Sequence, residues 1–310
     1  MEKQSRKYEK QFIIVELFLL LILTFILYIT NNNKIEKINN YNQTNRDIIY
    51  LKSEITNKSY EIEQLNKKIE SYNDLDGQLI SLKQEYYNTI KELEDKILKG
   101  ESNKKIAYLT FDDGPYYNTY KVLDILDRYG VKATFFTTSI NGEYCFDNKS
   151  QNCYILYQEY LKRGHTIANH TYTHGIWKGL YSSTDSFINA VKSQEDHVKN
   201  LSSGYTTNIL RFPGGSASAG SNKYAIIERL RQMGYGWVDW TAGDGDGGKL
   251  YSTEQAWNNF TSSINQNIEV VLLHDYNGIT TAILPDIIEY LQNNGYILLP
   301  LFYESNVINK

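Results

Sequence analysis

Short apolar runs alternate with longer amphipathic stretches from Lys105 to the end of the 310-residue chain, and this alternation limits the fold more than any other feature. The pattern is typical of βα units, whose strands lie parallel in one sheet. Strands are predicted at residues 105–111, 132–137, 166–168, 209–212, 236–239, 269–273 and 297–301. Helices are predicted at residues 121–129, 154–163, 186–201, 224–233, 253–264 and 281–292. We therefore predict an α/β domain at residues 103–310, a distorted (β/α)7-type barrel whose catalytic groups follow the C-terminal ends of its strands.

The N-terminal part of the chain carries a long apolar segment at residues 12–30, interrupted by one glutamate and two threonines. Its length matches the roughly 20 residues that a helix needs to cross a bilayer, so it predicts a transmembrane anchor. Four basic residues lie within residues 1–11, which predicts a cytoplasmic N-terminus and a catalytic domain outside a single-pass cell-membrane anchor. A cleaved signal peptide is the alternative, but its apolar core would be shorter and would end at small residues.

Residues 34–100 form a separate region in which apolar side chains recur every seven residues from Ile48 to Ile97. A second apolar register follows three residues later. The two registers together favour a coiled-coil stalk that forms a homodimer. A single helix without a partner is the alternative. Lys58, Asp76 and Lys83 fall on the two registers and weaken the apolar surface between the helices.

The composition excludes one class of partner and leaves the cysteines undecided. The formal charge is -4, without the basic excess of a nucleic-acid-binding protein. Cys145 and Cys153 lie in a polar stretch, where they form either a small disulfide-closed loop or two free thiols.

Residues with metal-binding and acid–base chemistry follow the first and third predicted strands. Asp112 and Asp113 end the first strand, so that one carboxylate can bind a metal while the other handles protons. His170 and His174 follow the third strand at a spacing that lets both face one ion. With Asp113 they predict a site of two histidines and one carboxylate, with positions left open for water and substrate.

Further candidates follow the later strands. Arg211 precedes Gly214 after the fourth strand, where an arginine can hold a carboxylate and a glycine lets backbone N–H groups approach a ligand. Asp239 and Trp240 follow the fifth strand, and His274 follows the sixth. Each has an ordinary structural alternative, as a turn, surface or core residue.

These motifs resemble those of the polysaccharide deacetylases of carbohydrate esterase family four, over about 200 residues from Lys105 nearly to the C-terminus. The first motif is matched by residues 110–115, with the sequence TFDDGP. The resemblance implies that Asp112 is the catalytic base and Asp113 a metal ligand. The second motif, His-x-x-x-His, makes His170 and His174 the other ligands.

The remaining motifs imply further roles. Arg211 would hold the catalytic aspartate, the N–H of Gly214 would help bind the oxyanion, and His274 would be the general acid. Leu272 would lie in the acetyl pocket, and Trp240 would contact substrate.

The chain departs from the family pattern at two positions. The family commonly has Tyr where Gly214 stands, which puts one wall of the sugar groove in doubt, and an earlier acidic residue where Gly236 stands. We assign Asp239 to orienting His274.

A glycine-rich loop after the fifth predicted strand carries two further carboxylates, Asp244 and Asp246. We interpret this loop as solvated, because a calcium loop would need a glutamate where Gln255 stands.

The resemblance implies a hydrolase that uses a divalent metal, zinc or alternatively cobalt, to remove N-acetyl groups from a polysaccharide. We expect peptidoglycan, in its N-acetylglucosamine units, as the substrate and partner. An O-acetyl esterase of the xylan type is an alternative on the same fold. A catalytically inert cell-wall-binding scaffold is a third interpretation, against which the intact ligands, base and acid argue.

Overall fold

The structure is a computed structural model that describes residues 13, 16–17, 19–24, 26, 44–139 and 150–310. The side chains of residues 44–52 and 150–154 also lie outside that description. Cys145 and the side chain of Cys153 are therefore not described, and both alternatives for the two cysteines, a disulfide or two free thiols, lie outside the described residues. The chain divides into two compact units, Met1–Glu85 and Tyr86–Lys310.

The first unit contains most of one long helix, α2 (Thr44–Leu98). Among the residues that the structure describes, no helix combines the length and the apolar composition that a bilayer crossing requires. The predicted transmembrane helix at residues 12–30 is wrong on this finding, and so is the single-pass cell-membrane location inferred from it. The physical reason is that a span needs roughly 20 apolar residues in one helix, whereas α2, the long helix that the structure describes, is rich in charged residues and asparagine.

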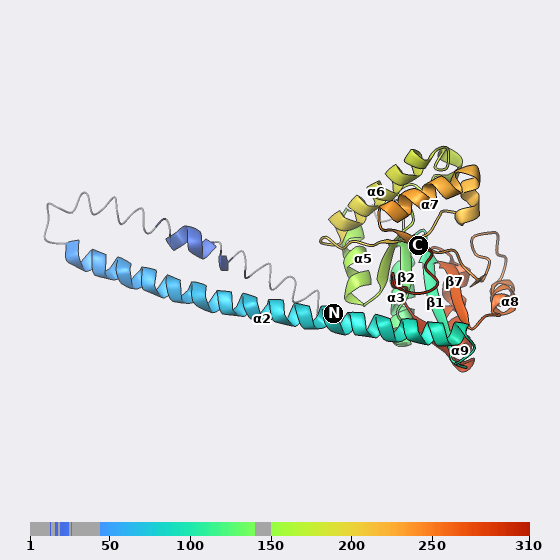
Figure 1. The fold of residues 1–310 in the computed structure, drawn as a ribbon, viewed down its shortest axis with the longest axis horizontal. Coiled ribbons are helices and arrows are strands. Elements are labelled where there is room, and N and C mark those ends of the chain that lie inside the picture. The colour runs from blue at the N-terminus through green and yellow to red at the C-terminus, as the bar shows by residue number, and fades with distance from the viewer. Residues whose placement is uncertain (1–12, 14–15, 18, 25, 27–43, 140–149) are drawn as a thin grey trace. The chain divides into compact units, whose positions relative to one another are not determined.

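The second unit is built on a curled parallel sheet with the strand order β5-β4-β3-β2-β1-β7-β6 (Figure 1). Its last strand, β8, pairs with the first half of β1. Among the described strands β5 and β6 are not paired, so the sheet curls toward a barrel without closing. The strands are β1 (Lys105–Asp112), β2 (Thr134–Thr137), β3 (Thr166–Asn169), β4 (Ile209–Leu210), β5 (Gly236–Trp237), β6 (Ala242–Gly243), β7 (Ile268–His274) and β8 (Tyr296–Leu299).

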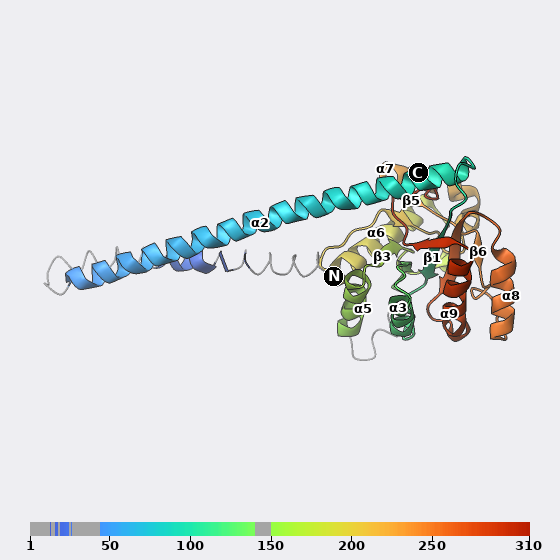
Figure 2. The same cartoon turned by 90° about the horizontal axis from the view of Figure 1, so that it is seen from below.

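Helices follow the strands and cover the outer face of the sheet (Figure 2). They pack side by side in the order α7, α6, α5, α3, α9, α8. Their bounds are α3 (Thr119–Arg128), α5 (Ser150–Lys162), α6 (Thr184–Leu201), α7 (Lys223–Gln232), α8 (Thr253–Ser263) and α9 (Gly278–Asn293), with the short 3-10 helices η1 (Ile176–Lys178) and η2 (Ser216–Asn222). α6 and α8 begin at serines whose hydroxyls accept a backbone N–H of the first turn, which is a favourable start for a helix.

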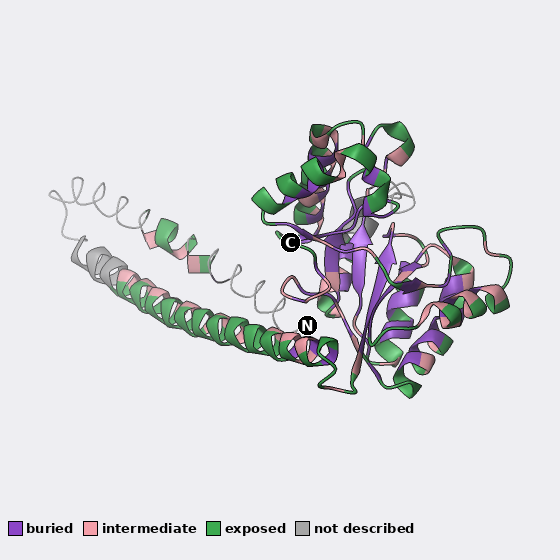
Figure 3. Cartoon of the chain, turned by 45° about the vertical axis from the view of Figure 1, so that its right-hand side comes forward, coloured by how far each residue is buried: buried purple, intermediate pink, exposed green. Residues whose placement is uncertain are grey.

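The alternation of side chains along β1 separates two regions of the core. Ala107, Leu109 and Phe111 face outward and pack against the surrounding helices. Ile106 and Tyr108 face inward, where they pack with the last turns of α2 and with the C-terminal segment. The strands are accordingly buried, while the outer faces of the helices are exposed (Figure 3).

The inward face of β1 becomes polar toward its C-terminal end, where Thr110 and Asp112 follow the two apolar positions. The parallel register sets Asp112 opposite His274 at the end of β7, and sets the end of β2 opposite Asn169 at the end of β3. The residues that follow these strands therefore meet at one edge of the sheet, as in other parallel α/β folds.

Candidate active site

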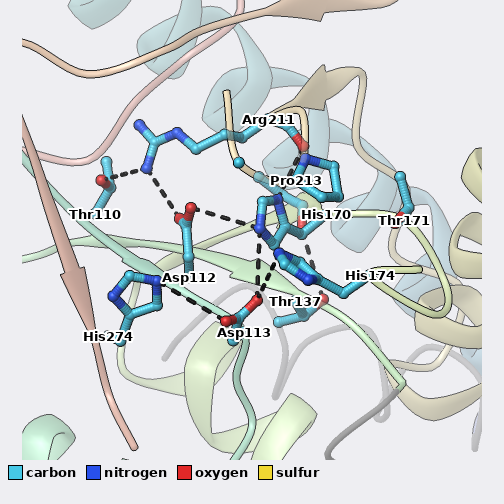
Figure 4. Close-up of polar contacts among 12 residues, drawn as sticks. Thr110, Asp112, Asp113, Thr137, His170, Thr171, His174, Arg211, Pro213 and His274 are labelled. Carbon is cyan, nitrogen blue, oxygen red and sulfur yellow. Dashed lines mark hydrogen bonds and ion pairs between the residues drawn. The ribbon is translucent and has the colours of Figure 1, made fainter. Parts of the chain in front are cut away.

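Three candidate metal ligands converge at this edge. Within the described residues Asp113, His170 and His174 form a group whose ligand atoms all lie within 4.8 Å of one another. Asp113 Oδ1 is 3.5 Å from His170 Nε2 and 3.4 Å from His174 Nε2 (Figure 4). The predicted ligand set is thus brought together by the loops after β1 and β3.

The chemistry of these side chains fits a divalent cation. His170 Nδ1 lies 2.8 Å from the carbonyl oxygen of Arg211, which only accepts, so Nδ1 carries the proton and the lone pair of Nε2 faces Asp113. Burial lowers the pKa of His170, although Asp112 and Asp113 oppose this effect, and the imidazole is therefore held neutral. Two imidazoles and one carboxylate are a donor set that binds zinc in hydrolases.

Two of the three ligands sit on strained backbone. Asp113 has φ 70° and His174 has φ 46°, values that side chains other than glycine rarely adopt. Such strain costs of order 1–3 kcal/mol per residue and clusters at functional sites. The next residue, Gly114, leaves no room for a side chain, because a Cβ there would lie 2.5 Å from Oδ2 of the buried Asp275.

Asp112 lies beside the metal-ligand group, with Oδ2 3.6 Å from His170 Nε2. Its other oxygen accepts a hydrogen bond of 2.9 Å from Nη1 of Arg211, whose side chain is fully buried. The same nitrogen donates to Thr110 Oγ1, and the guanidinium stacks over the ring of Phe136. A buried arginine held in this way fixes the orientation of the Asp112 carboxylate.

His274 completes the group from the end of β7, with Nε2 3.8 Å from Asp113 Oδ2. Its Nδ1 lies 2.7 Å from Asp246 Oδ1, and its backbone N–H donates to Asp246 Oδ2 at 2.7 Å. Burial disfavours the imidazolium, but the hydrogen bond and the charge of Asp246, with Asp113 and Asp112, raise the pKa of His274 to about 9. In this geometry Nδ1 donates to Asp246 and Nε2 faces the site.

The assignment of Asp239 to orienting His274 is therefore corrected. The Asp239 carboxylate accepts hydrogen bonds from the backbone N–H and the hydroxyl of Ser216, at 2.9 and 2.6 Å. Its backbone carbonyl accepts from Nη2 of Arg211. Asp239 thus supports the loop after β4, and the partner of His274 is Asp246.

The interpretation of the glycine-rich loop as solvated is also wrong, because Asp244 is fully buried and Asp246 is 3% exposed. The two carboxylates contact residues of α9 and β7. Thr280 Oγ1 of α9 contacts both, and His274 at the end of β7 contacts Asp246. The two aspartates, separated by one residue, are visible in the sequence, but their contacts with His274 and Thr280 are not.

The predicted substrate contacts lie around this group. Gly214 is exposed in the loop after β4, at φ 68°. A Cβ there would lie 2.9 Å from Ser218 Oγ and 3.0 Å from Ile176 Cδ1. These two side chains therefore leave little room for a side chain at position 214. Leu272 and Trp240 line one cavity of about 340 Å³ together with Asp246 and Gly247. Gly247 lies beside His274, since a Cβ there would be 3.2 Å from His274 Cε1.

The arrangement as a whole combines a candidate cation site, a buried carboxylate held by an arginine, an imidazole able to donate a proton and a nearby cavity. Those are the parts that a metal-assisted hydrolysis requires.

Comparison with known proteins agrees with this chemistry. The family model described as "Polysaccharide deacetylase" matches residues 99–237. A bifunctional xylanase/deacetylase from Pseudobutyrivibrio xylanivorans is 33% identical over 67% of this chain, but only 32% of that protein is covered. A peptidoglycan-N-acetylglucosamine deacetylase from Bacillus cereus is 30% identical, over 63% of this chain and 85% of the relative.

A solved structure extends the similarity to the fold. The catalytic domain of a peptidoglycan N-acetylglucosamine deacetylase from Eubacterium rectale is 33% identical and superposes with a TM-score of 0.60. The match covers 67% of this chain and 93% of that domain.

Proposed function

Since this chain belongs to the polysaccharide deacetylase family, we propose that it is a metal-dependent hydrolase that removes N-acetyl groups from N-acetylglucosamine units of peptidoglycan. The observation that carries the proposal is the convergence of Asp113, His170 and His174 beside Asp112. The named relatives and the solved domain from Eubacterium rectale support the choice of peptidoglycan.

Asp113, His170 and His174 would hold the cation, with zinc as the proposed ion and cobalt as a substitute. A bound divalent ion would polarise the acetamide carbonyl and lower the pKa of water toward about 7.

The residues around the cation site would transfer protons and bind the oxyanion of the reacting acetamide. Asp112, oriented by Arg211, takes a proton from the water that attacks the acetamide carbon. The backbone N–H of Gly214 donates to the oxyanion. His274 gives a proton to the amine nitrogen as the C–N bond breaks, which yields acetate and a free amino sugar.

The acetyl group and the sugar have separate contacts in this proposal. Leu272 borders the cavity beside His274 and would receive the acetyl methyl group. Trp240, which is 39% exposed, would contact the sugar.

The second candidate function is O-acetyl ester hydrolysis on xylan. The bifunctional xylanase/deacetylase relative favours it, and the same residues can hydrolyse an ester. The two functions differ in the leaving group, since an alcohol replaces the amine.

The test is acetate release by the purified chain from peptidoglycan, chitooligosaccharides and acetylated xylan, each with and without added zinc or cobalt. We expect metal-dependent release from the two N-acetylated substrates. Release from xylan alone would transfer the assignment to the esterase.

Two variants separate catalysis from metal binding. Asp112→Asn should abolish acetate release while zinc content stays near one ion per chain, because the ligands are untouched. His170→Ala should lose both. Normal acetate release by Asp112→Asn would remove Asp112 from its proposed role.

We also propose that the heptad residues of α2 pair two chains through the stalk. The apolar positions of the two registers from residue 48 to residue 86 support pairing, whereas Ile90, Leu93 and Ile97 pack in the core of the second unit. Sedimentation of the full chain would give a dimer, whereas a monomer at micromolar concentration would leave α2 as a single helix.

A further inference from the structure

Asp244 is a buried carboxylate that the proposed reaction does not use. It lies in the loop after β6 with no exposed surface. Its Oδ1 accepts the backbone N–H of Asp246 at 3.2 Å, and its Oδ2 lies 2.7 Å from Thr280 Oγ1. Asn259 donates to its backbone carbonyl at 3.0 Å, which ties the loop to α8.

The hydroxyl of Thr280 faces two carboxylates but has only one proton. Its Oγ1 lies 2.7 Å from Asp244 Oδ2 and 2.8 Å from Asp246 Oδ2. If both carboxylates were ionised, the hydroxyl could donate to one of them, and the other would face an oxygen lone pair at hydrogen-bond distance. One additional proton in the group resolves this conflict.

The additional proton belongs on Asp244. Asp246 accepts two N–H groups of His274, each at 2.7 Å, and these donors stabilise its ionised form. Asp244 has one longer backbone donor. Burial and the charge of Asp246 raise the pKa of Asp244 to about 7.

Within the part of the chain that the structure describes, the direct hydrogen-bond contacts of Asp244 include no cationic side chain. Asp246 lies beside Asp244 in the same loop. The imidazole of His274, at the end of β7, contacts Asp246. The contacts described from α8 and α9 are the neutral side chains of Asn259 and Thr280.

We propose that Asp244 and Thr280 are positioning residues for the general acid: protonated Asp244 donates to Thr280, Thr280 donates to Asp246, and Asp246 is thereby held toward His274 Nδ1. The proposal rests on the proposed function, which makes His274 the proton donor. Since Thr280 fixes Asp246 Oδ2, the Oδ1 atom is left for the imidazole. When Asp244 loses its proton, two anions face one hydroxyl and the chain of hydrogen bonds breaks.

The first test replaces the hydroxyl. Thr280→Val keeps the side-chain shape, and we expect about a 10- to 100-fold lower kcat on a chitooligosaccharide with KM nearly unchanged. Thr280→Ser should retain most of kcat. The matched control is Thr281→Val in the same helix, whose hydroxyl donates to the backbone carbonyl of Asn277 and touches neither carboxylate.

The second test uses the pH profile, which a purely structural role would not change. An asparagine at position 244 can donate an amide N–H to Thr280 and cannot ionise. Asp244→Asn should therefore keep kcat within about threefold of the original chain at pH 6, and it should lose the decline in kcat that deprotonation of Asp244 causes as the pH rises through about 7. A collapse of kcat in Asp244→Asn, with the fold intact, would mean that ionised Asp244 is needed and would overturn the proposal.

A spectroscopic measurement separates this proposal from the proposed function. The Nδ1–H proton of His274, identified by its loss in His274→Gln, should move in the NMR spectrum of Thr280→Val but not of Thr281→Val. If the original chain releases no acetate, the proposed function fails, and this shift still decides the hydrogen-bond chain. An unmoved resonance, or an unchanged kcat in Thr280→Val, would contradict the inference.

Discussion

Asp239, which follows β5, and Asp246, which follows β6, hold different hydrogen-bond partners. Asp246 receives His274 Nδ1–H, whereas Asp239 receives the N–H and hydroxyl of Ser216. The difference is one of partners, since both side chains are carboxylates in loops beside the same site. It makes their substitutions distinguishable by kinetics and by stability.

We predict that Asp246→Ala lowers kcat on a chitooligosaccharide by about a hundredfold or more, because a general acid contributes 10²- to 10⁴-fold and His274 would lose its orientation. Asp239→Ala should act chiefly on stability, by about 1–3 kcal/mol, since it leaves the Ser216 donors without their acceptor. Saturation kinetics and urea unfolding of both variants check this. Equal losses of kcat would contradict the division of roles.

The same pair shows how far residue-level prediction from sequence reaches. Asp112, Asp113, His170, Arg211 and His274 end strands or directly follow them, and His174 lies four residues beyond His170 in the same loop. The rule that strand ends gather catalytic groups was enough to bring them together. Asp246 lies three residues beyond a two-residue strand, and its position depends on Thr280 and His274, far along the chain. Such contacts have no local pattern in the sequence.

At the scale of elements, the last turns of α2 are part of the second unit's core. Ile90 and Ile97 are buried with Ile106 and Tyr108 of β1. The fully buried Glu94 accepts the hydroxyl of Tyr108 at 2.6 Å and the backbone N–H of Asn306 at 2.8 Å. α2 therefore ties the strand that carries Asp112 to the C-terminal segment.

We predict that Glu94→Ala destabilises the second unit by about 2–5 kcal/mol, because it leaves several buried donors without an acceptor. Glu92→Ala, an exposed position in the same helix, should change stability by less than about 0.5 kcal/mol. Thermal and urea unfolding measure both. Comparable losses in the two variants would mean that Glu94 does not hold α2 to the sheet.

Elements differ in how well a sequence pattern finds them. Each of the seven predicted strands coincides with an observed one, since runs such as residues 268–274 are continuous and buried. β6 (Ala242–Gly243) was missed, because two residues carry no alternation and its position is set by pairing with β7. β5 and β6, each of two residues, are the two ends of the sheet and do not pair with each other, so the barrel stays open.

At the scale of the whole molecule, the candidate metal site joins loops that are distant in sequence. Asp113 follows β1, and His170 and His174 follow β3, so that a bound cation would link two strands separated in the sheet by β2. An ion that binds only the folded chain stabilises it by mass action, by about 2.7 kcal/mol at a hundred times its dissociation constant. Metal binding should therefore appear in unfolding measurements that need no substrate.

We predict that zinc at such a concentration raises the Tm by roughly 5–10 °C and that a chelator reverses the rise, on a scale of about 2–4 °C per kcal/mol for a domain of this size. His174→Ala should lose most of the rise, since it removes one of the ligands. His197→Ala is the matched control, because His197 is not one of the three residues of the ligand group and should keep the rise. An equal rise in His174→Ala and the original chain would mean that the ion binds elsewhere, and the hydrolytic site would then lack the cation that its donor set fits.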